Sequence, residues 1–155
     1  MAKKKSITPK KIHNRRARYD YELGDEVIAG ISLNGRETKS LRLGHGHLRG
    51  SYVNVRGEEV WLTNATITSS PGFTIEDTEQ TQERKLLLKK REIKALVDAK
   101  KQGKTIVPLE LLTGGRYIKV KIAIGKGKKH YDKREAIKKR DIQKTNSLEL
   151  KRLSR

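Results

Sequence analysis

The sequence predicts a mainly β protein, a small closed antiparallel barrel with about three helices and a basic C-terminal tail. Two segments, 51–64 and 105–125, alternate apolar and polar residues on either side of a turn, as paired strands do. Helical spacing is confined to a few segments, and the chain is too short for two packed layers of many strands. Basic residues gather at both ends of the chain, where little apolar sequence is available to fold.

The strands are expected mostly as hairpins. An early strand covers about 25–33, and residues 51–64 form the first hairpin. The second hairpin has strands over 105–113 and 116–125, separated by Gly114-Gly115. Two glycines allow the positive φ angles that a two-residue hairpin turn requires.

The return strand of the second hairpin has two different faces. Tyr117, Lys119 and Lys121 fall on one face, outside the core, because successive side chains of a strand alternate. Pro108 in the partner strand lacks an N–H group, which predicts an edge or a bulge there. The inward face is aliphatic and consists of Ile118, Val120, Ile122 and Ile124.

A short helix is expected after the first strand. Asn34 at the N-cap and Glu37 three residues later form a capping-box pattern, and Gly44 is a stop signal. Lys39 and Arg42 lie three residues apart on this helix and are therefore neighbours.

A longer helix is expected over about 82–102. Leu86, Ile93 and Val97 form an apolar stripe, and Gly103 ends the helix. The polar side of this helix is basic and carries Lys89, Lys90, Arg91 and Lys94.

The net charge of +19 is distributed unevenly along the 155 residues. An N-terminal arm, 1–18, carries eight basic and no acidic residues, and a C-terminal tail, 126–155, carries twelve basic against four acidic residues. The body, 19–125, is nearly balanced. Segments with this much positive charge need a polyanion as a partner. RNA or DNA is the natural one, and such binding weakens as the salt concentration rises. The alternative is a solvated tail without a partner. The tail is expected to be disordered in the free protein and helical only against a polyanion.

Basic residues alternate with aromatic ones at both extremities. Residues 15–21 contain Tyr19 and Tyr21, and residues 128–134 contain Tyr131. Aromatic rings can stack on unpaired bases while cations hold the backbone. The alternative is that Tyr19 or Tyr21 begins a barrel strand with its ring buried.

The sequence does not match the residue patterns of common catalytic or metal-binding sites. The chain has no cysteine, which removes thiolate nucleophiles and cysteine zinc sites. His45 and His47 could form a metal pair, but alternating glycines favour surface loop histidines. Residues 125–129 do not lead into an apolar helix, so a nucleotide-binding loop is disfavoured. No apolar run suits a membrane span or a secretory signal, and we expect a cytoplasmic protein.

Several ordered blocks resemble the SmpB family, the small protein B that partners transfer-messenger RNA (tmRNA) in bacterial ribosome rescue. The resemblance runs from about residue 12 to 145. The blocks are Asn14-Arg15-Arg16-Ala17-Arg18-Tyr19, Ala29-Gly30-Ile31, Gly35-Arg36-Glu37-Thr38-Lys39-Ser40-Leu41-Arg42, Ser51-Tyr52-Val53, Arg84-Lys85-Leu86-Leu87-Leu88, Thr105-Ile106-Val107-Pro108-Leu109 and Gly127-Lys128-Lys129-His130-Tyr131-Asp132-Lys133-Arg134-Glu135.

The resemblance implies a six-stranded Greek-key OB-like barrel without catalysis, cofactor or metal. It implies binding to the tRNA-like domain of tmRNA and its delivery to stalled ribosomes for trans-translation. The tail would occupy the decoding centre of the small-subunit rRNA and the empty mRNA channel. Elongation factor Tu would be an indirect partner through tmRNA, and the protein would be a monomer. The alternatives are a generic OB-like ribosomal or RNA-binding protein and a small RNA-processing enzyme that uses His45, His47 or Asp132.

The resemblance and the charge pattern together give two sets of candidate residues. The RNA-binding set is Asn14, Arg15, Arg16, Arg18, Tyr21, Lys39, Arg42, Arg84, Lys85, Leu87, Lys89, Lys119, Lys121, Lys126, Gly127, Lys128 and Lys129. The decoding-centre set in the tail is His130, Tyr131, Asp132, Lys133, Arg134, Lys138, Lys139, Arg140 and Ile142.

Three positions depart from the family pattern. Ile28 stands where the family usually has an RNA-contacting Glu, Lys89 stands where Asn or His is frequent, and Ile142 stands where some members have an aromatic residue.

Overall fold

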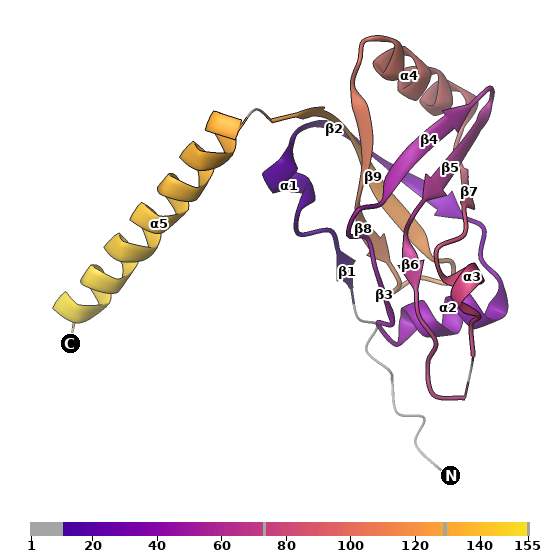
Figure 1. Ribbon diagram of the computed structural model, residues 1–155, viewed down its shortest axis with the longest axis horizontal. Helices are drawn as coiled ribbons and strands as arrows, with labels where there is room; N and C mark the ends of the chain where they lie inside the picture. Colours follow the sequence, from indigo (N-terminus) through magenta and orange to yellow (C-terminus); the bar gives the residue numbers. More distant parts are fainter. Residues whose placement is uncertain (1–10, 73, 129, 155) are drawn as a thin grey trace.

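The computed structural model describes residues 11–72, 74–128 and 130–154. Its body is a closed ring of six antiparallel strands in the order β8-β4-β5-β7-β2-β9, in which β9 pairs back with β8 (Figure 1). The predicted mainly β fold with a closed six-stranded sheet is confirmed. The strands of the ring are β2 (Tyr21–Ile31), β4 (Tyr52–Arg56), β5 (Glu59–Thr63), β7 (Arg84–Leu87), β8 (Thr105–Leu112) and β9 (Lys119–Gly127).

Among the described residues, three short strands lie outside the ring. β1 (Ile12–His13) pairs with the end of β8, and β3 (Gly46–His47) pairs with β6 (Thr66–Ile67) in a separate two-stranded sheet. The helices are α1 (Ala17–Asp20), α2 (Gly35–Arg42), α3 (Asp77–Gln80), α4 (Lys90–Lys101) and α5 (His130–Leu153). The sequence predicted about three helices. The additional helices are α1 and α3, which have only four residues each.

The core fills the inside of the ring. Val120 and Ile122 of β9 are buried, whereas Lys119, which begins the strand, is exposed, as the alternation predicts. α2 and α4 lie at opposite ends of the ring (Figure 1). The main cluster draws on every strand of the ring and on both of these helices, and includes Ala29, Leu41, Val53, Val60, Leu62, Leu86, Leu96, Ile106, Val120 and Ile122.

Both predicted hairpins are present, but the turn of the second is longer than expected. β4 and β5 pair from Tyr52 with Thr63 to Arg56 with Glu59. β8 and β9 pair up to Leu112 with Lys119, which leaves residues 113–118 as the connection. The two-residue turn at Gly114-Gly115 is therefore wrong, and neither glycine has positive φ. The longer connection buries Thr113 and Ile118 against the body.

The bulge expected at Pro108 is present, because the register of β8 against β9 shifts between Pro108 and Glu110. The capping box of α2 is also present. The Glu37 N–H donates to Asn34 Oδ1 at 2.9 Å, and the Asn34 N–H donates to Glu37 Oε2 at 3.3 Å. Gly44, with φ of 86°, follows the helix.

The single helix predicted over 82–102 is wrong in its first part. Residues 84–87 form β7, and only Lys90–Lys101 form the helix α4. Leu86 pairs with Val60 of β5 and Ile31 of β2 and is buried, so the segment closes the ring between two strands. Tertiary pairing overrides the helical propensity of this segment. Gly103, with φ of 78°, follows α4 as expected.

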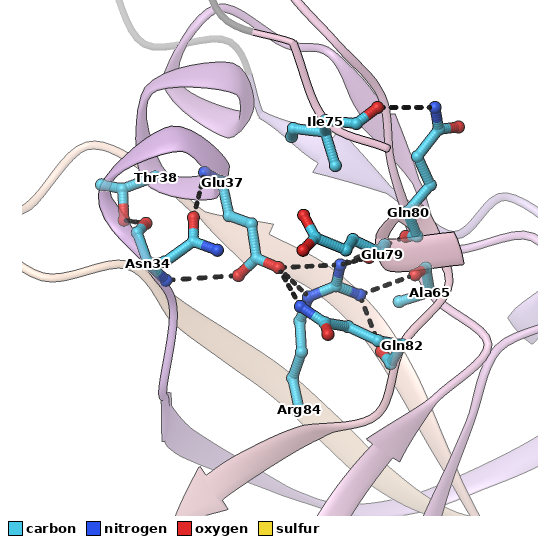
Figure 2. Close-up of polar contacts among 9 residues, drawn as sticks. All are labelled: Asn34, Glu37, Thr38, Ala65, Ile75, Glu79, Gln80, Gln82 and Arg84. Carbon is cyan, nitrogen blue, oxygen red and sulfur yellow. Dashed lines mark hydrogen bonds and ion pairs between the residues drawn. The ribbon is translucent and has the colours of Figure 1, made fainter. Parts of the chain in front are cut away.

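A buried ion pair fixes β7 to α2 (Figure 2). Arg84 Nε and Nη2 both donate to Glu37 Oε1, at 3.2 and 3.1 Å, and Gln82 Nε2 donates to the same oxygen at 2.7 Å. Both side chains of the pair are about 97% buried, at 2% and 3% exposure. The remaining donors of Arg84 reach the carbonyl oxygens of Ala65, Glu79, Gln80 and Gln82.

The tail is a helix in the isolated chain. The sequence had predicted that the tail would be disordered without a polyanion. α5 has 24 residues and extends away from the body (Figure 1). Its residues from 134 to 153 are exposed except for Ala136. Lys, Arg, Glu, Gln and Ala dominate its sequence, and these residues favour helix without tertiary packing. The helix is therefore presented to solvent and does not belong to the core.

Candidate nucleic-acid interface

The basic arm is folded onto the body from residue 11 onward. Ile12 pairs with Leu111 of β8, and Ile12 and Ala17 are buried. The Asn14 side chain donates to the Pro108 carbonyl at 2.9 Å, and its N–H donates to the Leu109 carbonyl at 2.7 Å. These contacts hold the backbone of the arm against the bulged part of β8. The arginines of the arm are thus exposed at fixed positions.

Three surface hollows meet at Asn14, with volumes of about 250, 370 and 330 Å³. Arginines line all of them, and we call Asn14, Arg15, Arg16, Arg18 and Arg49 the arm cluster. The sequence predicted the first four residues of this cluster. It missed Arg49, which follows β3 and lines two of the three hollows. The Arg49-Gly50 pair is the signal that could have indicated an exposed basic turn.

Two aromatic residues, Tyr19 and Tyr21, follow directly after the arm, and both are half-buried. Tyr21 is the first residue of β2 and packs against the small buried cluster of Ala17, Val107, Leu109 and Ala123. The guanidinium of Arg16 lies 5.5 Å from the centre of the Tyr19 ring, within the range of a cation–π contact. Tyr21 pairs with Gly127 and lines the smallest hollow.

The arm meets the start of the tail at one carboxylate. Asp20 Oδ1 lies 3.3 Å from Lys133 Nζ, and Asp20 Oδ2 lies 3.5 Å from Arg16 Nε. The Lys133 ammonium also lies 5.6 Å from the centre of the Tyr19 ring. Lys128 Nζ donates to the Arg18 carbonyl at 2.9 Å. The structure therefore brings Arg16 and Arg18 close to Lys128 and Lys133 at the start of the tail. Lys126 and Gly127 lie at the end of β9.

A second group of predicted residues lies on the outer face of β9, β2 and β7. Gly30 of β2 pairs with Lys119 on one side and with Leu87 on the other. Ile28, in the adjacent row, pairs with Lys121. Ile28 and Leu87 are 52% and 58% exposed, an unusual exposure for two large apolar side chains on one sheet face.

Lys121 on this face is already engaged. Its Nζ lies 3.7 Å from Glu26 Oε2 and 3.6 Å from Glu110 Oε1, and Glu110 also contacts His13 Nδ1 at 2.9 Å. A phosphate would have to compete with two carboxylates for this ammonium. Lys119 is exposed and better placed for a phosphate.

Other predicted residues lie elsewhere. Lys39 and Arg42 are on α2, and Arg42 Nη2 donates to the Arg116 carbonyl at 2.9 Å. Lys85 pairs with Glu59 at 3.1 Å, and Lys89 is the N-cap residue of α4. Arg84, which was also predicted to bind RNA, has a buried guanidinium whose donors are occupied by the protein.

One further ion pair lies near the hairpin of β4 and β5. The Glu83 carboxylate accepts hydrogen bonds from Arg56 at 2.8 and 2.6 Å and thereby raises the pKa of Arg56. This guanidinium stays charged in any case.

The tail residues divide into two groups. Arg134 and the positions further along α5 are exposed, namely Lys138, Lys139, Arg140 and Ile142. His130, Tyr131 and Asp132 begin the helix, but their side chains lie outside the described part of the structure, and Lys129 lies outside it entirely.

His45 directly precedes β3, whereas His47 lies within that strand and pairs with Thr66, so His47 is not the loop residue that the sequence predicted. Within residues 11–72, 74–128 and 130–154, His, Cys, Asp and Glu side chains form no group of three that could hold a metal ion. Over the same residues, no helix is both long enough and apolar enough to cross a membrane.

Comparison with known proteins identifies the family. The model of the SmpB protein family matches residues 11–152, and the chain therefore belongs to the SmpB family. An SsrA-binding protein of Oenococcus oeni is 43% identical over 97% of this chain and 98% of its own length. An SsrA-binding protein of Sphingopyxis alaskensis is 48% identical over 83% of this chain and 81% of its own.

A solved structure described as "tmRNA-SmpB: a journey to the center of the bacterial ribosome" contains a similar chain. It matches with a TM-score of 0.64 and 35% identity, over 82% of this chain and 94% of that chain. The match supports the fold.

Proposed function

We propose that this protein binds the tRNA-like domain of tmRNA and delivers it to stalled ribosomes for trans-translation. Family membership over residues 11–152 supports this function most directly. The arm cluster, a set of fixed and exposed cations around three hollows, suits the phosphates and unpaired nucleotides of a folded RNA. The protein acts by binding, without catalysis, as a cytoplasmic monomer that meets elongation factor Tu only through tmRNA.

The tail has a separate task in this proposal. α5 enters the decoding centre and the mRNA channel of the small subunit, which is empty on a stalled ribosome. Its exposed cations face rRNA phosphates there, and mRNA in the channel excludes it. Because the tail is already helical in the isolated chain, little further backbone ordering opposes its entry.

The outer face of β9, β2 and β7 forms a second contact area. Lys119 holds a phosphate, and the exposed Leu87 packs on a ribose or base. Ile28 extends this apolar contact where the family usually has Glu, so the contact relies less on hydrogen bonding at that position.

The division of labour is tested by removing the tail. Deletion of residues 133–155 should leave binding to the tRNA-like RNA within several-fold of the full chain and abolish peptide tagging on ribosomes stalled at the end of a truncated mRNA. A tail of scrambled order keeps its length and charge and serves as the control, and it should not restore tagging. Equal loss of RNA binding and tagging in the deletion would contradict the proposal.

A further inference from the structure

The smallest hollow of the arm cluster contains residues that the sequence analysis did not connect with RNA. Arg49 and Tyr52 line it together with an earlier segment that contributes Asn14, Arg16 and Tyr21. The two segments come from parts of the chain about 30 residues apart, so only the fold brings them together. The hollow has a volume of about 250 Å³.

A tight turn presents Arg49 at the edge of this hollow. The Ser51 N–H donates to the Leu48 carbonyl at 3.0 Å, and Gly50 at the third position of the turn has φ of 73°. Positive φ at that position is the feature that favours glycine in such turns. Asn64 Nδ2 donates to the Gly50 carbonyl at 3.2 Å and fixes the turn from the side. Arg49 therefore projects from a rigid support.

Tyr52 offers an exposed ring directly after this turn. Val53 next to it is 5% exposed and faces the core, so alternation along β4 turns Tyr52 outward, at 47% exposure. Its backbone is held by pairing with Thr63 of β5. A large ring fixed at the surface beside guanidinium groups suits the stacking of a base.

The charges around the hollow favour an anion. Among the described residues, no carboxylate lies within ion-pair distance of Arg49. Asp20 lines the hollow as well, but its two oxygens already face Arg16 and Lys133. Two cations therefore neutralise the Asp20 carboxylate, and the charge of Arg49 remains available to an anionic ligand.

We propose that this hollow holds one unpaired nucleotide of the bound RNA, with its base against the Tyr52 ring and its phosphate on Arg49. The inference rests on the proposed function. The volume is below the roughly 300–1,000 Å³ of pockets that enclose small-molecule ligands, so the hollow suits one unit of a polymer held elsewhere. Arg49 and Tyr52 are binding residues in addition to those of the arm.

The test compares four variants of the full chain for binding to the tRNA-like domain of tmRNA. Tyr52→Leu should weaken binding roughly 5- to 150-fold, the range for loss of one stacked base, and Tyr52→Phe should bind like the original protein. Arg49→Gln should weaken binding and reduce the slope of log K against log salt by roughly one, whereas Tyr52→Leu should leave the slope unchanged. Arg91→Gln, on α4, is the control for loss of one exposed arginine, and its slope should not change.

Chemical probing of the RNA gives a second readout. One unpaired nucleotide should be protected by the original protein and by Tyr52→Phe, and should become reactive again with Tyr52→Leu. Unchanged affinity, slope and protection in the Tyr52→Leu and Arg49→Gln variants would overturn the inference while leaving the proposed function intact. If the original protein does not prefer the tRNA-like RNA over a duplex of equal length, the proposed function fails, and the inference fails with it.

Discussion

Arg84 donates two hydrogen bonds to a single carboxylate oxygen of Glu37 (Figure 2), and both side chains are buried. The pair joins β7, which closes the ring, to α2, which covers one end of it. Four carbonyl oxygens take the remaining donors of Arg84. Arg84 therefore has a structural role, although it belongs to a basic block that the SmpB family shares.

Arg84→Met should lower the free energy of unfolding by about 3–5 kcal/mol, because it leaves the Glu37 carboxylate buried without its partner. Denaturant titration measures the loss. The matched control is Arg56→Met, which breaks the exposed pair with Glu83 and should cost only a small fraction of that amount. A loss of RNA affinity in folded Arg84→Met protein, without loss of stability, would contradict the structural role.

Gly46 lies where α2 packs against the small sheet. A Cβ atom at this position would lie 2.9 Å from Leu41 Cδ2 and 2.9 Å from the Thr66 carbonyl oxygen. Gly46→Ala should therefore destabilise the protein by about 1–3 kcal/mol, because the backbone oxygen cannot move aside cheaply. Thermal unfolding monitored by circular dichroism measures the change.

Gly35→Ala is the control for that prediction. In the part of the chain that the structure describes, no atom lies within 4 Å of a Cβ atom at Gly35, and the residue begins α2 with negative φ. The substitution should be neutral or stabilise the protein by about 0.4–1 kcal/mol through the unfolded chain. Equal melting temperatures for the two variants would show that Gly46 is not sterically constrained.

Lys119 and Lys121 should differ in their contribution to RNA binding, although they lie on the same face of β9. Lys119→Gln should weaken binding to the tRNA-like RNA and lower the salt slope by roughly one, as expected for one phosphate contact. Lys121→Gln should leave the slope unchanged, because its ammonium already lies between Glu26 and Glu110. Filter binding at several salt concentrations measures both, and equal slopes for the two variants would refute the distinction.

Local patterns in the sequence predicted most of the strands and the cap of α2, because these depend on neighbouring residues. The strand at 84–87 could not be predicted this way. Leu86 fits both a helical stripe and an alternating strand, and only its partners Val60 and Ile31 decide between them. Gly114-Gly115 suited a tight turn, but burial of Ile118 required a longer connection.

The candidate site was predictable in part for the same reason. A run of arginines in residues 15–18 indicates a basic surface without knowledge of the fold. Charge alone does not separate Arg84 from Arg15, since burial depends on Glu37, which lies 47 residues away. Arg49 and Tyr52 could not be recognised as site residues from the sequence, because they lie beside Asn14 only when the arm packs on β8.

Lys133 should set the direction of α5 relative to the body through its contacts with Asp20 and Tyr19. The chain has no cysteine, so the substitutions Glu58→Cys and Ser147→Cys create the two sites that a spin label can modify. The distance between the two labels then reports the direction of α5 relative to the body. Lys133→Glu should broaden the measured distance distribution, because it replaces attraction to the Asp20 carboxylate by repulsion. Lys133→Arg keeps the charge and the ring contact and should preserve the distribution. Identical distributions for both variants would mean that another contact orients the tail.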